Sequence, residues 1–297
     1  RIMNSISRFT RRTFIPRTLT AAAAAGATSF DVPAILAELS PGQKKSVKNY
    51  GGFQMGIQSY SLRAFGVDGA LEKIEGLGLH WVEFFRNHFP QTGDRLKIDE
   101  MNGKLKKHDV SISAHGVQSF TNDHAKNENF FKFAKLANIR NISANPSADS
   151  FESLDKLVKQ YDIRIAIHNH GPDAEYDKAA DVKKSVEKWD KRIGFCADLG
   201  HYIRSGEDPV KVINLLGDRL YGIHLKDFEE QKKKTKGVIL GKGHLDVEGV
   251  FKALKKVKFP ADGALSLEYE ENPQDPIAEI EECLSITAAA AKKVAKG

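Results

Sequence analysis

The sequence predicts a single α/β domain built as a closed (β/α)8 barrel, or TIM barrel, preceded by an N-terminal export signal. Three observations lead to the barrel. Strand-like and helix-like segments alternate eight times from residue 53 to residue 297, and such alternation produces a parallel sheet covered by helices. Eight units in about 245 residues have the length of a closed barrel. No glycine-rich phosphate loop follows the first strand, which disfavours the rival open, doubly wound sheet.

The eight strands are predicted from short apolar runs that end at turn-forming or polar residues. They cover residues 54–60, 79–85, 110–115, 141–144, 163–167, 193–197, 220–225 and 264–269. The third alternates small and apolar residues. The fifth is an alternating apolar run, and the Gly171-Pro172 pair that follows it stops the strand.

A helix is predicted after each strand. The helices cover residues 67–77, 98–108, 129–137, 151–161, 180–189, 209–216, 247–257 and 276–296. The first ends among glycines, Gly76 and Gly78, and Pro209 stands in the first turn of the sixth, where its missing N–H removes no hydrogen bond. The longest loop, residues 228–243, carries three consecutive lysines and is either a solvated charged loop or a flexible lid.

The first 52 residues differ in character from the rest. Arg11 and Arg12 precede Phe14 and an alanine-rich apolar stretch, an order of basic, apolar and small residues that is typical of an export signal. The paired arginines indicate a bacterial-type twin-arginine signal over residues 1–30, and hence a periplasmic protein. The alternative is a short alanine-rich helix after a basic arm. Residues 31–52 are expected to be a linker, and residues 53–297 the barrel.

Charge and hydropathy limit the classes of partner. The net charge is +6, but residues 1–27 hold five arginines and no acid, so subtracting them leaves +1. A nearly neutral domain gives no support for nucleic-acid binding. No apolar run reaches the roughly 18 to 20 residues of a membrane-spanning helix, so stable membrane insertion is not expected. The two cysteines are expected to be buried thiols. The oligomeric state stays open, a homo-oligomer included.

Four predicted strands end in residues that bind metals. These residues are His168, Asp198, His224 and Glu268. If the strands are parallel neighbours, their carboxyl ends meet at one face and the four side chains converge. Two imidazoles and two carboxylates suit one divalent ion such as Zn²⁺, Mn²⁺, Co²⁺ or Fe²⁺. Without a metal, the same residues would be polar groups lining a sugar pocket.

The run from His168 to Glu270 resembles the xylose isomerase-like TIM barrels of the sugar phosphate isomerase/epimerase superfamily. This group includes sugar isomerases, ketose 3-epimerases, inosose dehydratases and barrel endonucleases of abasic sites. The motifs that carry the resemblance are Asp198-Leu199-Gly200-His201, His224-Leu225-Lys226-Asp227, Gly241-Lys242-Gly243-His244-Leu245-Asp246 and Leu267-Glu268-Tyr269. The resemblance implies the same four metal ligands and makes His201 a substrate contact.

The sequence departs from the epimerase pattern at position 168. That branch has a glutamate there, which works with the one matching Glu268 as acid and base on opposite faces of the substrate. A metal-bound imidazole does not readily shuttle a proton, so a symmetrical two-carboxylate epimerisation is not implied. Glu268 stays a candidate base, and His170, His201 and Lys226 are candidate acid/base or oxyanion groups.

We therefore expect a metal-dependent sugar or keto-sugar isomerase or epimerase that abstracts a proton next to a carbonyl. One alternative is a lyase or hydratase of dehydratase type acting on a 3-keto sugar or inosose. Another is a non-catalytic sugar-binding barrel. An abasic-site enzyme is disfavoured by the neutral domain and the export signal. Glu83 and His115 are expected to face the pocket at strand ends, and Arg204 to hold a hydroxyl, carboxylate or phosphate of a small carbohydrate substrate.

Overall fold

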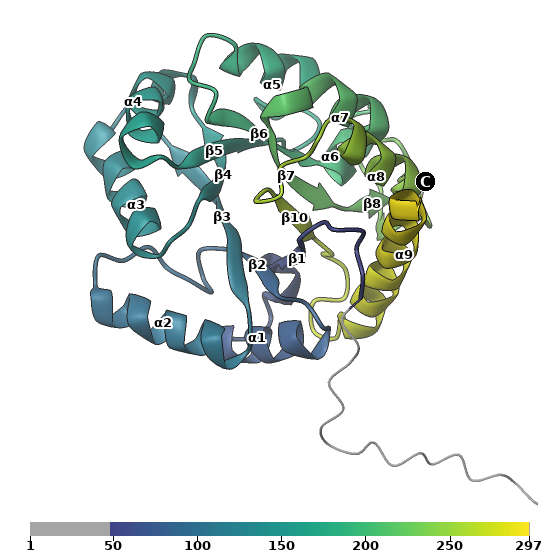
Figure 1. Cartoon of the computed structure of the whole chain (residues 1–297). Helices are drawn as coiled ribbons and strands as arrows, with labels where there is room; N and C mark the ends of the chain where they lie inside the picture. Colours follow the sequence, from purple (N-terminus) through teal and green to yellow (C-terminus); the bar gives the residue numbers. More distant parts are fainter. Residues whose placement is uncertain (1–47, 297) are drawn as a thin grey trace, which may run out of the picture. The chain divides into compact units, whose positions relative to one another are not determined.

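The computed structural model describes residues 48–296, so the predicted signal segment 1–30 and most of the predicted linker lie outside the described residues. Within residues 48–296, eight parallel strands close into a barrel in the order β1-β10-β7-β6-β5-β4-β3-β2 (Figure 1). The first and last barrel strands pair in parallel, with Gly56 of β1 opposite Ser266 of β10. This closure confirms the predicted (β/α)8 fold.

The barrel strands follow the predicted order along the chain. They are β1 (Met55–Gln58), β2 (Trp81–Phe84), β3 (Ser111–Phe120), β4 (Asn141–Pro146), β5 (Arg164–His168), β6 (Ile193–Asp198), β7 (Leu220–Leu225) and β10 (Ala264–Leu267). A separate antiparallel pair, β8 (Asp227–Phe228) and β9 (Gly237–Val238), lies in the loop after β7.

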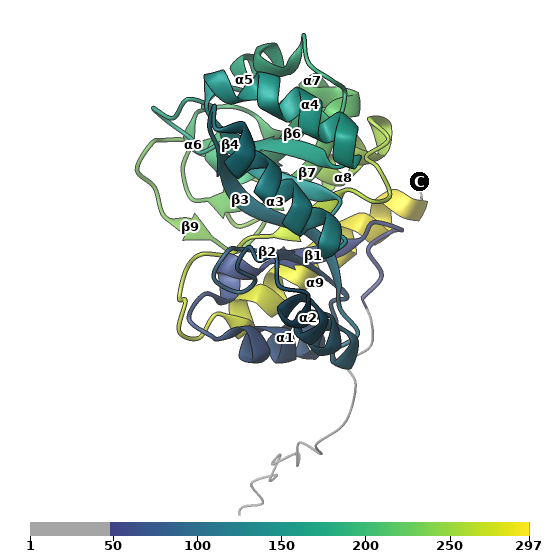
Figure 2. The same cartoon turned by 90° about the vertical axis from the view of Figure 1, so that its left-hand side faces the viewer.

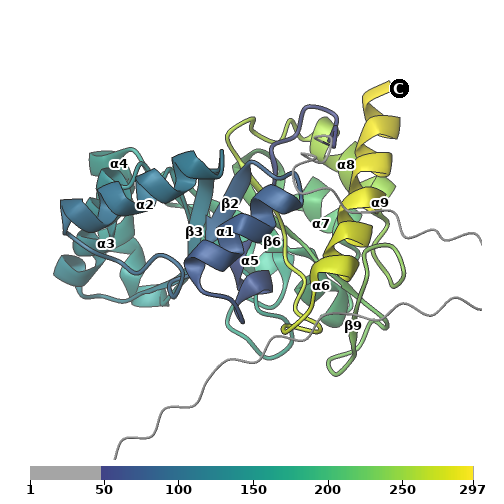
Figure 3. The same cartoon turned by 90° about the horizontal axis from the view of Figure 1, so that it is seen from below.

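The helices form a ring outside the strands, as Figures 1 and 3 show. They are α1 (Val67–Gly76), α2 (Arg95–Lys107), α3 (His124–Leu136), α4 (Phe151–Tyr161), α5 (Ala179–Val186), α6 (Leu199–Arg204), α7 (Pro209–Leu216), α8 (Val247–Lys256) and α9 (Ile277–Lys296). Three short 3₁₀ turns lie at Ser59–Leu62, Ala148–Ser150 and Gly217–Arg219. None of the described helices is both long enough and apolar enough to cross a membrane.

The core lies between the strands and the helix ring, because each helix has one apolar face. In α8 the buried positions Val247, Val250, Phe251 and Leu254 follow the three- and four-residue spacing of a helix. Inside the ring, strand residues such as Ile165 of β5 and Ile223 of β7 are fully buried. The rigid barrel that results fixes the backbone at the carboxyl ends of the strands, which is where a (β/α)8 protein carries its site.

Several elements differ from their predicted bounds, and three of the differences have a clear local cause. Strand β3 runs to Phe120, five residues past the predicted end, because its register with β4 shifts after His115 and pairing then resumes. Helix α6 begins directly after Asp198, whose carboxylate accepts a hydrogen bond from the backbone N–H of His201 at 2.8 Å. The loop after β7 contains the β8–β9 pair, which lies at the same end of the barrel as α6 (Figure 2).

Candidate metal centre and active site

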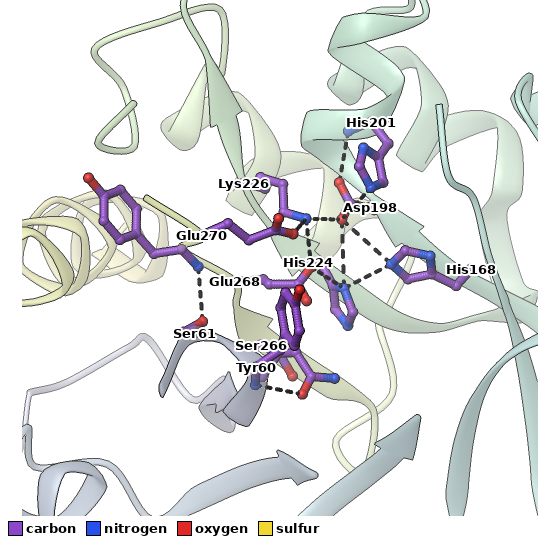
Figure 4. A network of polar contacts seen from close by, with 12 residues as sticks. Tyr60, Ser61, His168, Asp198, His201, His224, Lys226, Ser266, Glu268 and Glu270 are labelled. Carbon is purple, nitrogen blue, oxygen red and sulfur yellow. Dashed lines mark hydrogen bonds and ion pairs between the residues drawn. The ribbon is translucent and has the colours of Figure 1, made fainter. Parts of the chain in front are cut away.

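The four strand-end residues expected to converge lie together at the carboxyl ends of β5, β6, β7 and β10 (Figure 4). One ligand atom from each of His168, Asp198, His224 and Glu268 lies within 4.8 Å of the other three, and all four residues are buried. Barrel register produces this convergence, since Asp198 of β6 is directly paired with His224 of β7. The strands therefore deliver the four groups from neighbouring positions.

The facing atoms are mostly acceptors. Nε2 of His168 lies 3.1 Å from Nδ1 of His224, which in turn lies 3.1 Å from Oε2 of Glu268. Oδ2 of Asp198 is buried and lies 3.5 Å from Nε2 of His168, and the Lys226 ammonium lies 2.9 Å from the same oxygen. The four groups thus turn their lone-pair atoms toward one another in a buried space. Two imidazole nitrogens and two carboxylates are a donor set that fits a divalent ion.

Local hydrogen bonds hold these ligand atoms in place. The Asn169 side chain donates to the carbonyl oxygen of Asp198 at 3.0 Å and accepts from its N–H at 2.8 Å, which ties the end of β5 to the end of β6. Oδ1 of Asp198 caps α6, so its Oδ2 is turned toward the cluster. Because the backbone and Oδ1 are both fixed, Oδ2 has little freedom to move away from the cluster.

Lys226 places a buried ammonium beside the four residues. Its Nζ lies 2.9 Å from Asp198, 2.7 Å from Glu268 and 2.6 Å from Glu270. Gly200 leaves room for this side chain, because a Cβ added there would lie 2.5 Å from Cγ of Lys226. Burial alone would lower the pKa of Lys226, but the three carboxylates raise it well above its usual value. Lys226 is therefore a permanent cation and hydrogen-bond donor, and cannot serve as a base.

The two ligand carboxylates are ionised. Burial alone would raise the pKa of Glu268, but the Lys226 ammonium and His224 outweigh it and lower the pKa far below its usual value. Burial would likewise raise the pKa of Asp198, whereas neighbouring His201 and Lys226 hold it well below. Both groups consequently offer negative oxygens at neutral pH without first losing a proton.

The two histidines beyond the cluster are arranged differently. Burial lowers the pKa of His201 to about 3, so its ring is neutral at pH 7. The Arg204 guanidinium lies 3.2 Å from Nδ1 of His201, and because arginine can only donate, Nδ1 accepts and Nε2 carries the proton. His170 stacks on the His201 ring with centroids 6.1 Å apart. His201 thus presents an N–H beside the cluster.

A cavity of about 330 Å³ opens above these groups. It is lined by Gln58, Tyr60, Phe85, Arg86, Gly116, Val117, His168, His170, His201, Lys226, Glu268 and Glu270. The volume and the mix of aromatic and polar walls suit a small polar ligand. A larger hollow of about 720 Å³ lies by the opposite ends of the strands, among residues such as Arg140, Arg164 and Asp262, away from the cluster.

Two expected substrate contacts lie elsewhere. Glu83 is 0% exposed and hydrogen-bonds to His224 inside the barrel, beneath the cluster. His115 is buried outside the barrel, with its ring against Phe130 and Phe133 of α3. The expectation that both face the pocket is therefore wrong. Strand alternation turns His115 toward the helix layer, whereas Glu83 points inward but one layer too deep.

Arg204 lies beside the site, in the wall of a second hollow of about 200 Å³ that His201 and Lys226 also line. Its guanidinium donates twice to the carbonyl oxygen of Lys233, at 3.1 and 3.0 Å, and so binds the loop after β8 rather than standing free for a substrate. The same loop is held by Asp227, whose carboxylate accepts from five backbone N–H groups. These belong to Phe228, Gly241, Gly243, His244 and Leu245. The loop is thus anchored at both ends.

Sequence reasoning missed the supporting roles of Asn169 and Asp227. Asn169 directly follows His168, and Asp227 directly follows Lys226. The signal that would have found them is general: a short polar side chain just past a buried strand tends to bind nearby backbone groups. Their partners lie up to 29 residues away for Asn169 and 18 for Asp227, which no local pattern specifies.

Comparison with known proteins confirms the resemblance to the xylose isomerase-like TIM barrels. The family model described as xylose isomerase-like TIM barrel matches residues 145–286. Inosose dehydratase of Clostridium beijerinckii is 27% identical over 142 residues, 42% of this chain and 47% of that protein. The match thus spans about half the length of the curated relatives.

Two solved structures extend the likeness over the barrel. An uncharacterised protein from Parabacteroides distasonis superposes with a TM-score of 0.63 at 28% identity, covering 79% of this chain and 97% of that chain. The 3-keto-D-glucoside 4-epimerase from E. coli superposes with a TM-score of 0.63 at 13% identity, covering 80% of this chain and 99% of that chain. At that identity the second likeness shows the fold alone.

Proposed function

We propose that this protein is a metal-dependent enzyme that abstracts a proton next to the carbonyl of a keto-sugar or a cyclic polyol ketone. The observation that carries the proposal is the convergence of His168, Asp198, His224 and Glu268 beside a cavity of about 330 Å³. Charged and polar groups gathered at one cavity wall are typical of catalytic sites. The relatives named inosose dehydratase support a substrate of this class.

The metal would be held by Nε2 of His168, Nδ1 of His224 and one carboxylate oxygen each of Asp198 and Glu268. When bound, a divalent ion supplies Lewis acidity that favours charge on a neighbouring carbonyl oxygen. Glu268 is the group that can take up a proton, since it is ionised and lines the cavity. Its low pKa makes it a weak base in the metal-free protein, so proton uptake depends on a substrate made acidic by its carbonyl.

The remaining groups act as donors. The Lys226 ammonium can donate a hydrogen bond to a negative oxygen of the substrate, because it stays protonated and lines the cavity. The N–H of His201 is a second, neutral donor. His170 also lines the cavity, and because burial lowers its pKa to about 4, its neutral ring is a candidate hydrogen-bond donor to a substrate hydroxyl at pH 7. These assignments divide the candidate acid/base groups into one base and three donors.

Dehydration is the second candidate outcome, and His168 favours it. Epimerisation requires a base on each face of the substrate, and position 168 supplies an imidazole whose Nε2 faces the cluster. β-Elimination requires only one base and one proton donor to the leaving hydroxyl; Glu268 is the candidate base, and His170 in the cavity wall is the candidate donor. Substitution of His168→Glu restores a second carboxylate and should raise epimerase activity relative to water loss.

The proposal is tested by incubating metal-loaded protein with keto-sugars and inososes in D₂O. We expect NMR to detect solvent deuterium at the carbon next to the carbonyl, and removal of metal by a chelator to abolish it. Loss of one water from the product mass identifies dehydration. Binding of a sugar without deuterium exchange would instead mean a non-catalytic sugar-binding barrel, and undiminished exchange in stripped protein would contradict the metal requirement.

A further inference from the structure

The two nitrogens of the His224 ring face different groups. Nδ1 lies 3.1 Å from both His168 Nε2 and Glu268 Oε2, within the proposed metal site. Nε2 points the other way and lies 3.0 Å from Oε2 of Glu83. We propose that Glu83 is a positioning residue that holds the proton of His224 on Nε2 and thereby presents Nδ1 to the metal. The inference rests on the proposed metal site and deepens it.

Glu83 is a buried carboxylate whose hydrogen-bond partners are two serine hydroxyls and the His224 ring. The side chain is 0% exposed, so its charge has no contact with solvent. The hydroxyl of Ser143 donates to Oε1, and the hydroxyl of Ser266 donates to Oε2 at 2.8 Å. Two neutral hydroxyls are weak compensation for a buried anion, and the N–H of His224 adds the stronger partner. Hydrogen bonds from serines of β4 and β10 therefore hold the Glu83 carboxylate against the His224 ring of β7.

The protonation of His224 follows from this geometry. An ionised carboxylate can only accept hydrogen bonds, so the 3.0 Å contact between Glu83 and Nε2 places a proton on Nε2. Without a metal, Nδ1 can carry a second proton toward Glu268, 3.1 Å away, and this is the proton that a bound metal would replace. A neutral imidazole protonated at Nε2 has its lone pair on Nδ1, which faces the three other ligand residues. A carboxylate behind a ligand histidine fixes the ring and increases its basicity, and the loss of such a partner typically weakens metal affinity by about 10- to 100-fold.

Cys196 offers a rival arrangement. One ligand atom each from Glu83, Cys196 and His224 also lie within 4.8 Å of one another, so an ion could in principle be bound on the Nε2 side of the ring. Two features oppose this. Burial raises the pKa of the Cys196 thiol to about 11, which disfavours the thiolate that a metal needs. Both oxygens of Glu83 already accept hydrogen bonds from serine hydroxyls.

The experiment measures Zn²⁺ affinity by competition with a chromophoric chelator. Glu83→Gln should weaken Zn²⁺ binding by about 10-fold and Glu83→Leu, which removes the acceptor, by about 100-fold. Glu75→Gln is the matched control, because Glu75 also pairs with an imidazole, that of His108 at 2.7 Å, but on the outer helices. Its Zn²⁺ affinity should equal that of the unaltered protein. Wild-type affinity in folded Glu83→Leu would overturn the proposal.

Two measurements on the unaltered protein decide the matter even if the variants do not fold. In Zn²⁺-loaded protein labelled with ¹⁵N-histidine, the His224 ring should show a hydrogen-bonded proton on Nε2 and none on Nδ1. The reverse pattern would overturn the proposal. Loading with Co²⁺ should produce no thiolate charge-transfer band, and its appearance would place the ion beside Cys196 instead. If the unaltered protein binds neither Zn²⁺ nor Co²⁺, the proposed metal-dependent function fails. If it binds them but the His224 ring shows the reverse pattern, only the proposed role of Glu83 fails.

Discussion

The two carboxylate oxygens of Asp198 have separate tasks, and two substitutions can separate them. Oδ1 accepts from the backbone N–H of His201 and caps α6, whereas Oδ2 faces the proposed metal site. Asp198→Asn keeps an efficient cap but removes the charge, because asparagine and aspartate cap helices almost equally well. Asp198→Ala removes both functions. The backbone of residue 198 stays tied to Asn169 in either variant, so the strand end should keep its position.

The structure sets the expected magnitudes. Loss of the cap in Asp198→Ala should cost about 1 kcal/mol, which in a domain of this size lowers the melting temperature by about 2 to 4 °C. Asp198→Asn should melt close to the unaltered protein. Lys226 keeps Glu268 and Glu270 as partners in both variants, so its burial stays compensated. Loss of a residue that hydrogen-bonds a metal ligand weakens affinity by up to about 100-fold. Because Asp198 is itself a proposed ligand, both variants should lose more than about 100-fold in Zn²⁺ affinity.

Thermal unfolding in the presence of a chelator measures the cap without interference from metal, and mass spectrometry of the loaded proteins measures occupancy. The cap argument is refuted if Asp198→Ala and Asp198→Asn melt at the same temperature. The ligand assignment is refuted if either variant holds metal as fully as the unaltered protein. The two readouts are independent, since one concerns Oδ1 and the other Oδ2.

Three further predictions concern a base, a buried imidazole and export. Glu268→Gln should bind metal more weakly and, at saturating metal, lose about 10²- to 10⁴-fold in turnover, and normal turnover would make Glu268 a ligand only. Burial lowers the pKa of His115 to about 4, so between pH 7 and pH 5 the unfolded chain takes up a proton that the folded protein does not. As the pH is lowered from 7 to 5, the free energy of unfolding should therefore decrease by about 2 kcal/mol because of this residue. Denaturant unfolding of His115→Gln should show a pH dependence that is smaller by that amount. An equal pH dependence in the two proteins would contradict the argument. Replacement of Arg11 and Arg12 by lysine should leave precursor in the cytoplasm, as fractionation and blotting would detect, whereas unchanged export would exclude the twin-arginine interpretation.

The order of strands and helices and the identity of the four cluster residues were predictable from the sequence alone. Apolar runs of strand length recur at regular spacing, and His168, Asp198, His224 and Glu268 each stand at the end of such a run. Because parallel strands deliver their carboxyl ends to one face, position along the chain translates directly into position in space. The convergence needed no knowledge of side-chain contacts.

The tertiary structure decided everything that depends on register or on contacts between distant segments. Glu83 and His224 are 141 residues apart, and no local pattern specifies that their side chains meet beneath the cluster. His115 was misplaced because a strand alternates its faces, so a one-residue difference in phase turns a side chain from the pocket to the helix layer. Lys226 stands within the motif His224-Leu225-Lys226-Asp227, but its three carboxylate partners come from β6 and from the end of β10. Only the packing of these partners around the ammonium keeps it protonated. Local sequence determines which groups reach the barrel face, whereas protonation and hydrogen-bond direction are set by neighbours that folding brings from elsewhere in the chain.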